Sequence, residues 1–308
     1  MLRFALGSAL VVAFACTGPG APADTETGST STTGDTGAAA CAGEAIACHR
    51  ETLLIEAEAL AGGLDAPGRV ILDLRGQAEY DAGHVPGARR FDGGLIRATV
   101  DGIPGQVADR AAVEAALGAV GVSAESEVIA YDDGDGLGAA RLVWTLRYYG
   151  VGSSRALDGG WTGWSAGGWP QSAAAESPEA ATLTLAEGDP RLRVDAAWIV
   201  ARMAEPGLAL VDARTVEEYD AGHLPGAVLV PWPENKGADD LFLADAPLRA
   251  RYEAAGILDA ETVVVYCQTG SRASVGWLGL ALLDHPDVRL YDGSWAEWGS
   301  DPGLPKEP

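Results

Sequence analysis

The chain has 308 residues, 47% of them hydrophobic, and this length favours two domains that each bury a core of their own. Its formal net charge is −23 at pH 7, so the surface repels nucleic acid and anionic lipid headgroups, and we expect neither as a partner. The four cysteines and four histidines lack the spacing of a metal framework, so the sequence predicts no metal site and implies no organic cofactor.

Residues 1–16 have the pattern of a signal peptide. Arg3 supplies the positive charge, a short apolar run follows, and small residues precede Cys16. The run is too short for a membrane-spanning helix, which needs about 20 apolar residues. Cys16 resembles the acylated cysteine of a bacterial lipobox, with ordinary signal-peptide cleavage as the alternative. We therefore expect an exported, periplasmic or cell-surface protein that contacts the membrane only through a lipid anchor.

Residues 17–50 are predicted to form a low-complexity tether, because Thr, Gly, Ser and Ala dominate and cannot bury a core. Cys41 and Cys48 lie near the end of this segment and are candidates for a disulfide, since disulfides persist in exported proteins. That pairing would leave Cys267 as a lone thiol.

The remaining chain contains an internal repeat. The block from Glu79 to Ala88 recurs from Glu218 to Ala227 with one substitution, and an Asp-x-Arg motif precedes both copies. An Asp-Gly turn with a nearby tryptophan closes both copies. A duplicated domain is the simplest explanation. We expect an N-terminal domain over residues 51–170, a linker over 171–190 and a C-terminal domain over 191–304.

Strands and helices alternate along both copies. Short apolar runs at 70–72, 128–131, 208–211 and 262–266 read as buried strands, and helices are predicted at 110–117, 139–149 and 274–283. This alternation predicts an α/β fold in which each domain is a parallel sheet covered by helices on both faces. Ligands of such sheets bind beyond the carboxyl ends of the strands.

Cys267 stands at such a strand end, directly before a predicted helix. Backbone N–H groups of a tight loop, the helix N-terminus and Arg272 would favour its thiolate. The loop residues Gln268, Thr269, Gly270 and Ser271 are therefore candidates for substrate binding beside Arg272. The alternative is an inert buried cysteine.

In these motifs the chain resembles the rhodanese family. The repeated Glu-Tyr-x-Ala-Gly-His-x-Pro-Gly-Ala block is similar to the family's characteristic segment, and Cys267 to Arg272 resembles its six-residue active-site loop. The resemblance covers about residues 52–304. It implies two tandem rhodanese-like domains and a sulfurtransferase with Cys267 as the catalytic nucleophile. Such an enzyme would take sulfur from a small anionic donor as a persulfide and pass it to cyanide or a thiol.

The N-terminal copy departs from this pattern. Asp132 stands where Cys267 does, and the loop that follows is longer and acidic. This copy resembles the catalytically silent half of tandem rhodaneses.

Further side chains have open roles. The resemblance implies that Arg214, in the second Asp-x-Arg motif, contacts the substrate anion, and a salt bridge is the alternative. His84 and His223 occur in both copies, which favours a structural role, with a general base as the alternative for His223. Trp232 could line the cleft, and Arg249 and Arg251 are further candidates for anion binding.

The expected donor is thiosulfate, with 3-mercaptopyruvate as the alternative. A non-catalytic sulfur-carrier or binding module at the cell surface is a second class of function. A phosphatase is a third, disfavoured because the loop from Cys267 to Arg272 is one residue short of those that admit phosphate.

Overall fold

The computed structural model describes residues 50–308. The predicted signal peptide and nearly all of the tether lie outside the described residues, and so do Cys16, Cys41 and Cys48. Nothing in the described part forms a helix that is both long and apolar enough to cross a membrane.

The first domain is built on a five-stranded parallel sheet with strand order β1-β7-β6-β2-β3. Its strands are β1 (Leu54–Ile55), β2 (Arg69–Asp73), β3 (Arg89–Arg90), β6 (Glu127–Tyr131) and β7 (Ser154–Leu157). Its helices are α2 (Ala57–Ala61), α3 (Gln77–Ala82), η1 (Gly93–Ile96), α4 (Arg110–Ala119), α5 (Leu137–Tyr148) and α6 (Gly160–Ala166).

The second domain repeats this plan with strand order β10-β9-β11-β12-β8, again with parallel neighbours. Its strands are β8 (Arg193–Val194), β9 (Leu208–Asp212), β10 (Val228–Leu229), β11 (Thr262–Tyr266) and β12 (Val288–Tyr291). Its helices are α7 (Ala196–Arg202), α8 (Val216–Asp220), η2 (Trp232–Asn235), α9 (Asp245–Ala254), α10 (Ser271–Leu282) and α11 (Ser294–Trp298).

Both sheets are covered on both faces, as predicted. Successive strand residues point to opposite sides of a sheet. In β11, Val263 and Val265 join one hydrophobic cluster, whereas Val264 and Tyr266 join another. Neither face is left to water, and the predicted α/β fold is confirmed.

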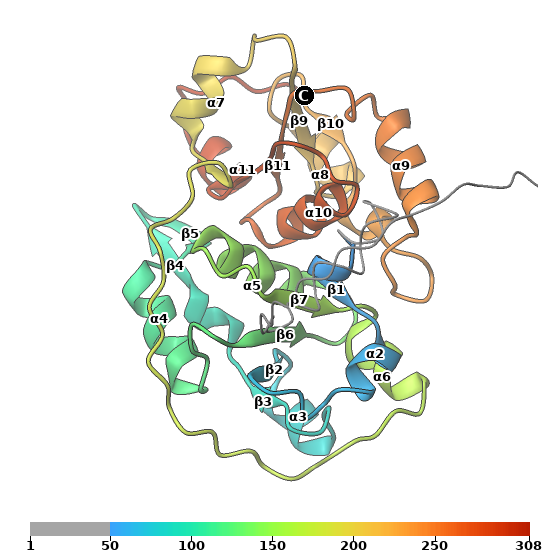
Figure 1. Cartoon of the computed structure of the whole chain (residues 1–308). Helices are drawn as coiled ribbons and strands as arrows, with labels where there is room; N and C mark the ends of the chain where they lie inside the picture. Colours follow the sequence, from blue (N-terminus) through green and yellow to red (C-terminus); the bar gives the residue numbers. More distant parts are fainter. Residues whose placement is uncertain (1–49) are drawn as a thin grey trace, which may run out of the picture. The chain divides into compact units, whose positions relative to one another are not determined.

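One of these clusters extends through both domains. Helices α5 and α10, which follow the two equivalent loops, lie against each other (Figure 1). Residues 139–146 of α5 and 273–280 of α10 are buried without interruption, which is typical of helices enclosed on all sides. The two domains therefore share a core.

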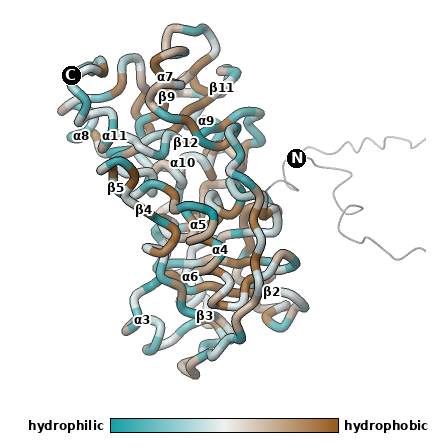
Figure 2. Tube along the Cα trace, turned by 90° about the vertical axis from the view of Figure 1, so that its left-hand side faces the viewer, coloured by the Kyte–Doolittle hydropathy of each residue, from teal (hydrophilic) through white to brown (hydrophobic). Residues whose placement is uncertain are grey.

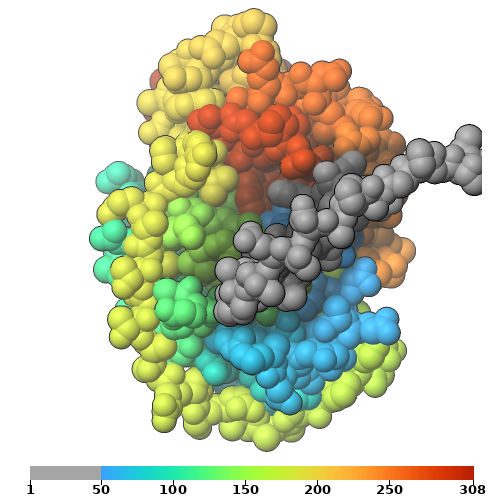
Figure 3. Space-filling view, in the orientation of Figure 1, coloured from blue at the N-terminus to red at the C-terminus, as the bar shows by residue number. Residues whose placement is uncertain are grey.

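The connecting segment does not form helix or strand between residues 173 and 189. It runs over the first domain near α4 (Figure 3). Leu183 and Leu185 are buried there, and the Leu185 N–H donates to the Glu114 carboxylate at 2.9 Å.

An antiparallel hairpin of β4 (Arg97–Val100) and β5 (Ile103–Val107) was not predicted from the sequence. Its turn is Asp101-Gly102, with φ values of 51° and 82°, and Asp-Gly is a preferred pair for such tight turns. Figure 2 shows the hairpin at the junction of the two domains. Hydrogen bonds place it against the C-terminal domain: the Val107 N–H donates to Asp292 at 2.7 Å.

Candidate active site

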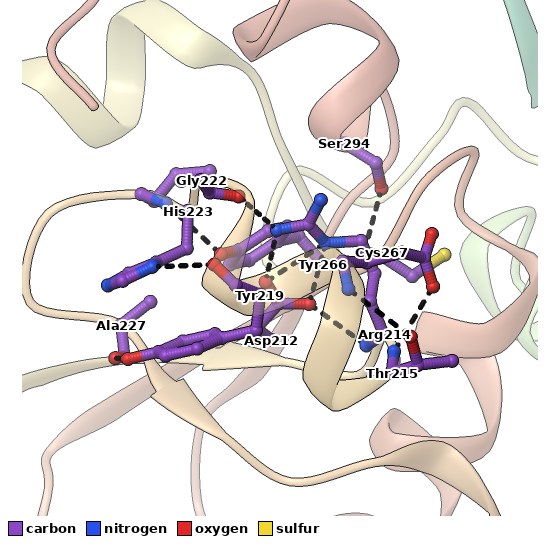
Figure 4. Close-up of polar contacts among 12 residues, drawn as sticks. Asp212, Arg214, Thr215, Tyr219, Gly222, His223, Ala227, Tyr266, Cys267 and Ser294 are labelled. Atoms are coloured by element: carbon purple, nitrogen blue, oxygen red, sulfur yellow. Dashed lines mark hydrogen bonds and ion pairs between the residues drawn. The ribbon is translucent and has the colours of Figure 1, made fainter. Parts of the chain in front are cut away.

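Cys267 directly follows β11 at the carboxyl edge of the sheet, and three residues separate it from α10. Its sulfur accepts the Gly270 N–H at 3.1 Å. Its own N–H donates to the Ser294 hydroxyl at 3.1 Å (Figure 4). The Trp295 N–H donates to the Cys267 carbonyl at 2.9 Å, so the start of α11 fixes the loop.

The thiol is deeply placed, since Cys267 is 1% exposed. The loop residues around it, Gln268, Thr269, Ser271 and Arg272, are partly exposed. The sulfur accepts one amide N–H, from Gly270, and the residue also belongs to the hydrophobic cluster that both domains share. The sequence prediction of an amide-lined loop therefore agrees with this geometry.

Gly270 adopts φ +87°, a conformation that glycine takes without strain. A Cβ at this position would lie 2.9 Å from Arg141 Nη1 and 2.9 Å from Asp292 Oδ1. Gly270 thus serves the site in two ways: its N–H faces the sulfur, and its missing side chain admits a charged pair beneath the loop.

Arg272 lies in the first turn of α10, which begins three residues earlier than predicted. Its guanidinium forms two hydrogen bonds with the Glu218 carboxylate, at 2.5 and 2.8 Å. The hydrogen bond to Glu218, and then the charges of Cys267 and Glu218, raise the pKa of Arg272 against the effect of burial. In return, Arg272 lowers the pKa of Glu218 to about 2. Arg272 therefore supports the sulfur while most of its charge is balanced.

Arg214 does not reach the loop rim as the resemblance implied. Its guanidinium pairs with Asp212 at 2.7 Å and donates to the Gly222 carbonyl at 2.7 Å (Figure 4). It also lies over the Trp295 ring, and its side chain is only 2% exposed. Arg75 makes the same pair with Asp73 in the copy that has no thiol. Arg214 therefore forms the internal salt bridge that was the alternative, and the substrate contact that the resemblance implied stays a prediction.

The two histidines also repeat one arrangement. His223 Nδ1 lies 3.0 Å from the Tyr219 carbonyl and its ring stacks on Tyr219, as Figure 4 shows. His84 does the same with Tyr80 in the first domain. This shared geometry supports the structural role in loop fixation.

Among the described residues, no hydrogen bond or ion pair joins the remaining candidates to Cys267. Trp232 packs against the shared hydrophobic cluster. Arg251 pairs with Glu234, and Arg249 donates to the Leu283 carbonyl at 3.5 Å. These partners belong to other elements than the Cys267 loop.

The loop of the first domain is filled by a carboxylate. Asp132 accepts hydrogen bonds from the N–H groups of Gly134, Gly136 and Ala139, at 3.1, 3.0 and 2.9 Å. A side-chain anion thus occupies the amide-lined space where the second domain carries its thiol.

Sequence reasoning missed several residues of the site. Glu218 was named only as the first residue of the repeated block, and Ser294 was not singled out. Ser294 adopts φ +52°, an unusual conformation for a residue with a side chain, whereas its counterpart Gly160 has φ +53°. This replacement of glycine by serine in one copy alone was visible in the sequence. Strain tolerated at one residue is typical of functional sites.

Side chains of the first domain also reach this site, and no local motif marked them. Arg97 Nη1 donates to the Ser271 hydroxyl at 3.0 Å. Arg141 pairs with Asp292 at 2.7 Å, and both are buried. Among the described residues, no cluster of His, Cys, Asp and Glu could hold a metal ion.

Comparison with known proteins identifies the family. The rhodanese-like domain matches residues 56–167 and again 195–301. The chain is 32% identical over 264 residues to a thiosulfate sulfurtransferase of Azotobacter vinelandii, covering 83% of this chain and 97% of that protein. It is 35% identical over 277 residues to a probable 3-mercaptopyruvate sulfurtransferase of Pseudomonas aeruginosa, covering 82% and 96%.

A solved structure shares the fold. The anaerobic ergothioneine biosynthesis enzyme of Chlorobium limicola superposes with a TM-score of 0.75 at 23% identity, over 84% of this chain and 70% of that one. Two rhodanese-like domains are matched, and the similarity covers nearly the full length of the sulfurtransferase relatives. The chain therefore belongs to the rhodanese family and is a sulfurtransferase.

Proposed function

We propose that the protein takes a sulfane sulfur from thiosulfate onto Cys267 and passes it to cyanide or a small thiol. The observation that carries this proposal is the Cys267 sulfur just beyond the end of β11, where it accepts the Gly270 N–H at 3.1 Å. Its relatives include a thiosulfate sulfurtransferase over almost the whole folded chain.

The reaction proceeds in two covalent steps. The Cys267 thiolate attacks the sulfane sulfur of thiosulfate, the S–S bond of the donor breaks, and sulfite leaves with the electron pair. The resulting persulfide keeps one negative charge, which the Gly270 N–H and Arg272 are placed to stabilise. Cyanide then attacks the outer sulfur, and thiocyanate leaves as the cysteine thiolate is restored.

The first domain is proposed to be catalytically silent. It has no thiol at the equivalent position, and the Asp132 carboxylate already uses the amide donors of its loop. An anionic donor would be repelled there, since Asp133 and Asp135 lie in the same loop.

3-Mercaptopyruvate is the second donor to test, because a relative at 35% identity carries that name. The loop residues Gln268, Thr269 and Ser271 are uncharged and do not separate the two donors. Steady-state rates with each donor, measured on one preparation, decide which gives the higher kcat/KM.

The deciding test for the covalent step is intact mass after incubation with thiosulfate. We expect a gain of about 32 Da, one sulfur, that cyanide removes and that the Cys267→Ser variant does not show. Equal thiocyanate production by the variant would remove Cys267 from the mechanism. Persulfide formation without turnover by cyanide would favour the sulfur-carrier alternative, and hydrolysis of p-nitrophenyl phosphate would favour a phosphatase.

Export and lipidation at Cys16 are proposed from the sequence pattern alone. We expect the mature chain to begin at an acylated Cys16 and to partition with membranes, whereas Cys16→Ala should abolish acylation. N-terminal mass analysis of the protein recovered from the two fractions checks this. A mature chain with an unmodified N-terminus would favour ordinary signal-peptide cleavage.

A further inference from the structure

We infer that Arg97 of the first domain binds the anionic group of the sulfur donor, such as the sulfonate end of thiosulfate, beside the Cys267 loop. This inference rests on the proposed function, because it names the donor-binding residue of that same site. The domain without a thiol would then complete the active site of the other domain.

Arg97 begins strand β4 and reaches across to the nucleophile loop. Its Nη1 donates to the Ser271 hydroxyl at 3.0 Å and its Nε donates to the Gly93 carbonyl at 3.2 Å. The residue is exposed, so a small solute can reach it. Within the described part of the chain, no carboxylate lies at ion-pair distance from its guanidinium. Its charge is therefore free to meet an anion, unlike that of Arg272.

A second guanidinium stands beneath the same loop. Arg141 is 1% exposed, and its Nη2 pairs with Asp292 at 2.7 Å. Its Nη1 and Nε have no hydrogen-bond partner among the described residues. A Cβ on Gly270 would lie 2.9 Å from that Nη1, so the unused donor faces the loop backbone. A buried donor without an acceptor is costly unless a ligand supplies one.

The two guanidinium groups influence each other. Burial, and then the positive charge of Arg141, lower the pKa of Arg97. An anion bound near both would relieve this repulsion. Because the whole chain is strongly acidic, such local cations are what a dianionic donor needs to approach the thiol.

The duplicated fold contains its own comparison. Arg97 follows η1 in the first domain, and Lys236 follows η2 in the second, so the two residues are equivalent. Lys236 Nζ donates to the Gly134 carbonyl in the loop of the other domain, just as Arg97 donates to Ser271. Each domain thus extends one cation over the loop of its neighbour.

The two loops differ in the negative group that lies near that cation. Burial lowers the pKa of Lys236, and the charge of Asp132 is foremost among those that raise it. In the first-domain loop the anion is therefore built in, as a carboxylate held by three backbone N–H groups. In the second-domain loop Cys267 replaces that carboxylate, and the group that Arg97 contacts is the neutral Ser271 hydroxyl, so a donor anion can serve as its partner.

The test compares Arg97→Gln and Arg97→Lys with wild type, and Lys236→Gln serves as the control for an equal loss of charge at the equivalent position. We expect Arg97→Gln to raise the KM for thiosulfate roughly tenfold to a hundredfold, the value of one charged hydrogen bond. Arg97→Lys should recover part of this loss, and Lys236→Gln should leave the KM within about twofold of wild type. Circular dichroism confirms that each variant is folded.

A second measurement does not depend on sulfur transfer. Alkylation of Cys267 is followed on its peptide with iodoacetate, which is anionic, and iodoacetamide, which is neutral and of similar size. Arg97→Gln should lower the rate ratio of iodoacetate to iodoacetamide, whereas Lys236→Gln should not. If wild type forms no persulfide, the proposed function fails. The alkylation rate ratio then still tests whether Arg97 attracts anions to Cys267. An unchanged ratio, or an unchanged KM in an active Arg97→Gln protein, overturns the inference.

Discussion

Cys267 and Asp132 occupy equivalent places in two copies of one fold. They differ in the group that faces the loop, which is a thiol in one copy and a carboxylate in the other. A carboxylate satisfies the loop amides permanently, whereas a sulfur accepts the Gly270 N–H and keeps a reactive lone pair. Three side chains support the second loop: the Ser294 hydroxyl accepts the Cys267 N–H, and Arg272 in the first turn of α10 pairs with Glu218.

The Glu218–Arg272 pair predicts a pH dependence of stability. The pKa of Glu218 is lowered to about 2 by Arg272, so the carboxylate contributes stability above pH 4.5, its ordinary value, and loses it as the pH falls toward 2. After allowance for solvent screening of a half-buried pair, the contribution is on the order of 1 kcal/mol. Glu218→Gln should therefore lower the free energy of unfolding at pH 7 by that amount and have little effect at pH 2.

Urea denaturation of wild type and variant across this pH range gives the comparison. Glu217→Gln is the matched control, since Glu217 is exposed on the same helix and forms no ion pair among the described residues. An equal loss of stability for Glu218→Gln at both pH values would show that packing, and not charge, is responsible.

At the scale of elements, the β4–β5 hairpin joins the two domains at the active site. Gly105 in β5 approaches the nucleophile loop so closely that a Cβ there would lie 2.7 Å from the Thr269 carbonyl oxygen. The hairpin also delivers Arg97 and the Val107 N–H to the second domain. A displacement of this element should therefore weaken donor binding without touching Cys267.

Gly105→Ala tests this placement against Gly102→Ala. Both glycines have nearly the same φ, +83° and +82°, but a Cβ at Gly102 would meet nothing within 4 Å. Each variant should therefore pay a similar backbone cost of roughly 1 kcal/mol, visible in thermal melts. Only Gly105→Ala should also raise the KM for thiosulfate, by about tenfold if the Arg97 contact is lost. Equal KM values for the two variants would show that the position of the hairpin does not affect donor binding.

At the scale of the whole molecule, the shared cluster makes the two domains interdependent. Leu142 of α5 is fully buried in the cluster that also contains β11 and α10, whereas Leu60 of α2 belongs to a cluster confined to the first domain. Leu142→Ala should cost about 2–5 kcal/mol, as large-to-small core changes do. We expect this loss to be felt in both domains.

Hydrogen exchange measured by mass spectrometry checks that expectation. In Leu142→Ala, peptides from β6 and from β11 should lose protection together, because they pack on one core. In Leu60→Ala, we expect the loss to be larger in β6 than in β11. A loss confined to the first domain in both variants would mean that the domains open independently.

The sequence by itself determined the duplication, the α/β class and the choice of Cys267 as candidate nucleophile. Each follows from local pattern: repeated blocks, apolar strands that alternate with helices, and a cysteine at a strand end. These features depend on neighbours in the chain, so periodicity and motif reveal them. The four predicted strands lie close to the observed β2, β6, β9 and β11. Helix α10 begins at Ser271, because the last residues of the nucleophile loop form its first turn.

Only the tertiary structure decided which charges surround that nucleophile. Arg214, which the family resemblance assigned to the substrate, forms an ion pair with Asp212 of its own motif. Arg272 is balanced by Glu218, far from it in sequence, and the unpaired guanidinium comes from Arg97 in the other domain. Whether a charge is free depends on burial and on partners brought together by packing, and no spacing within one copy carries that information.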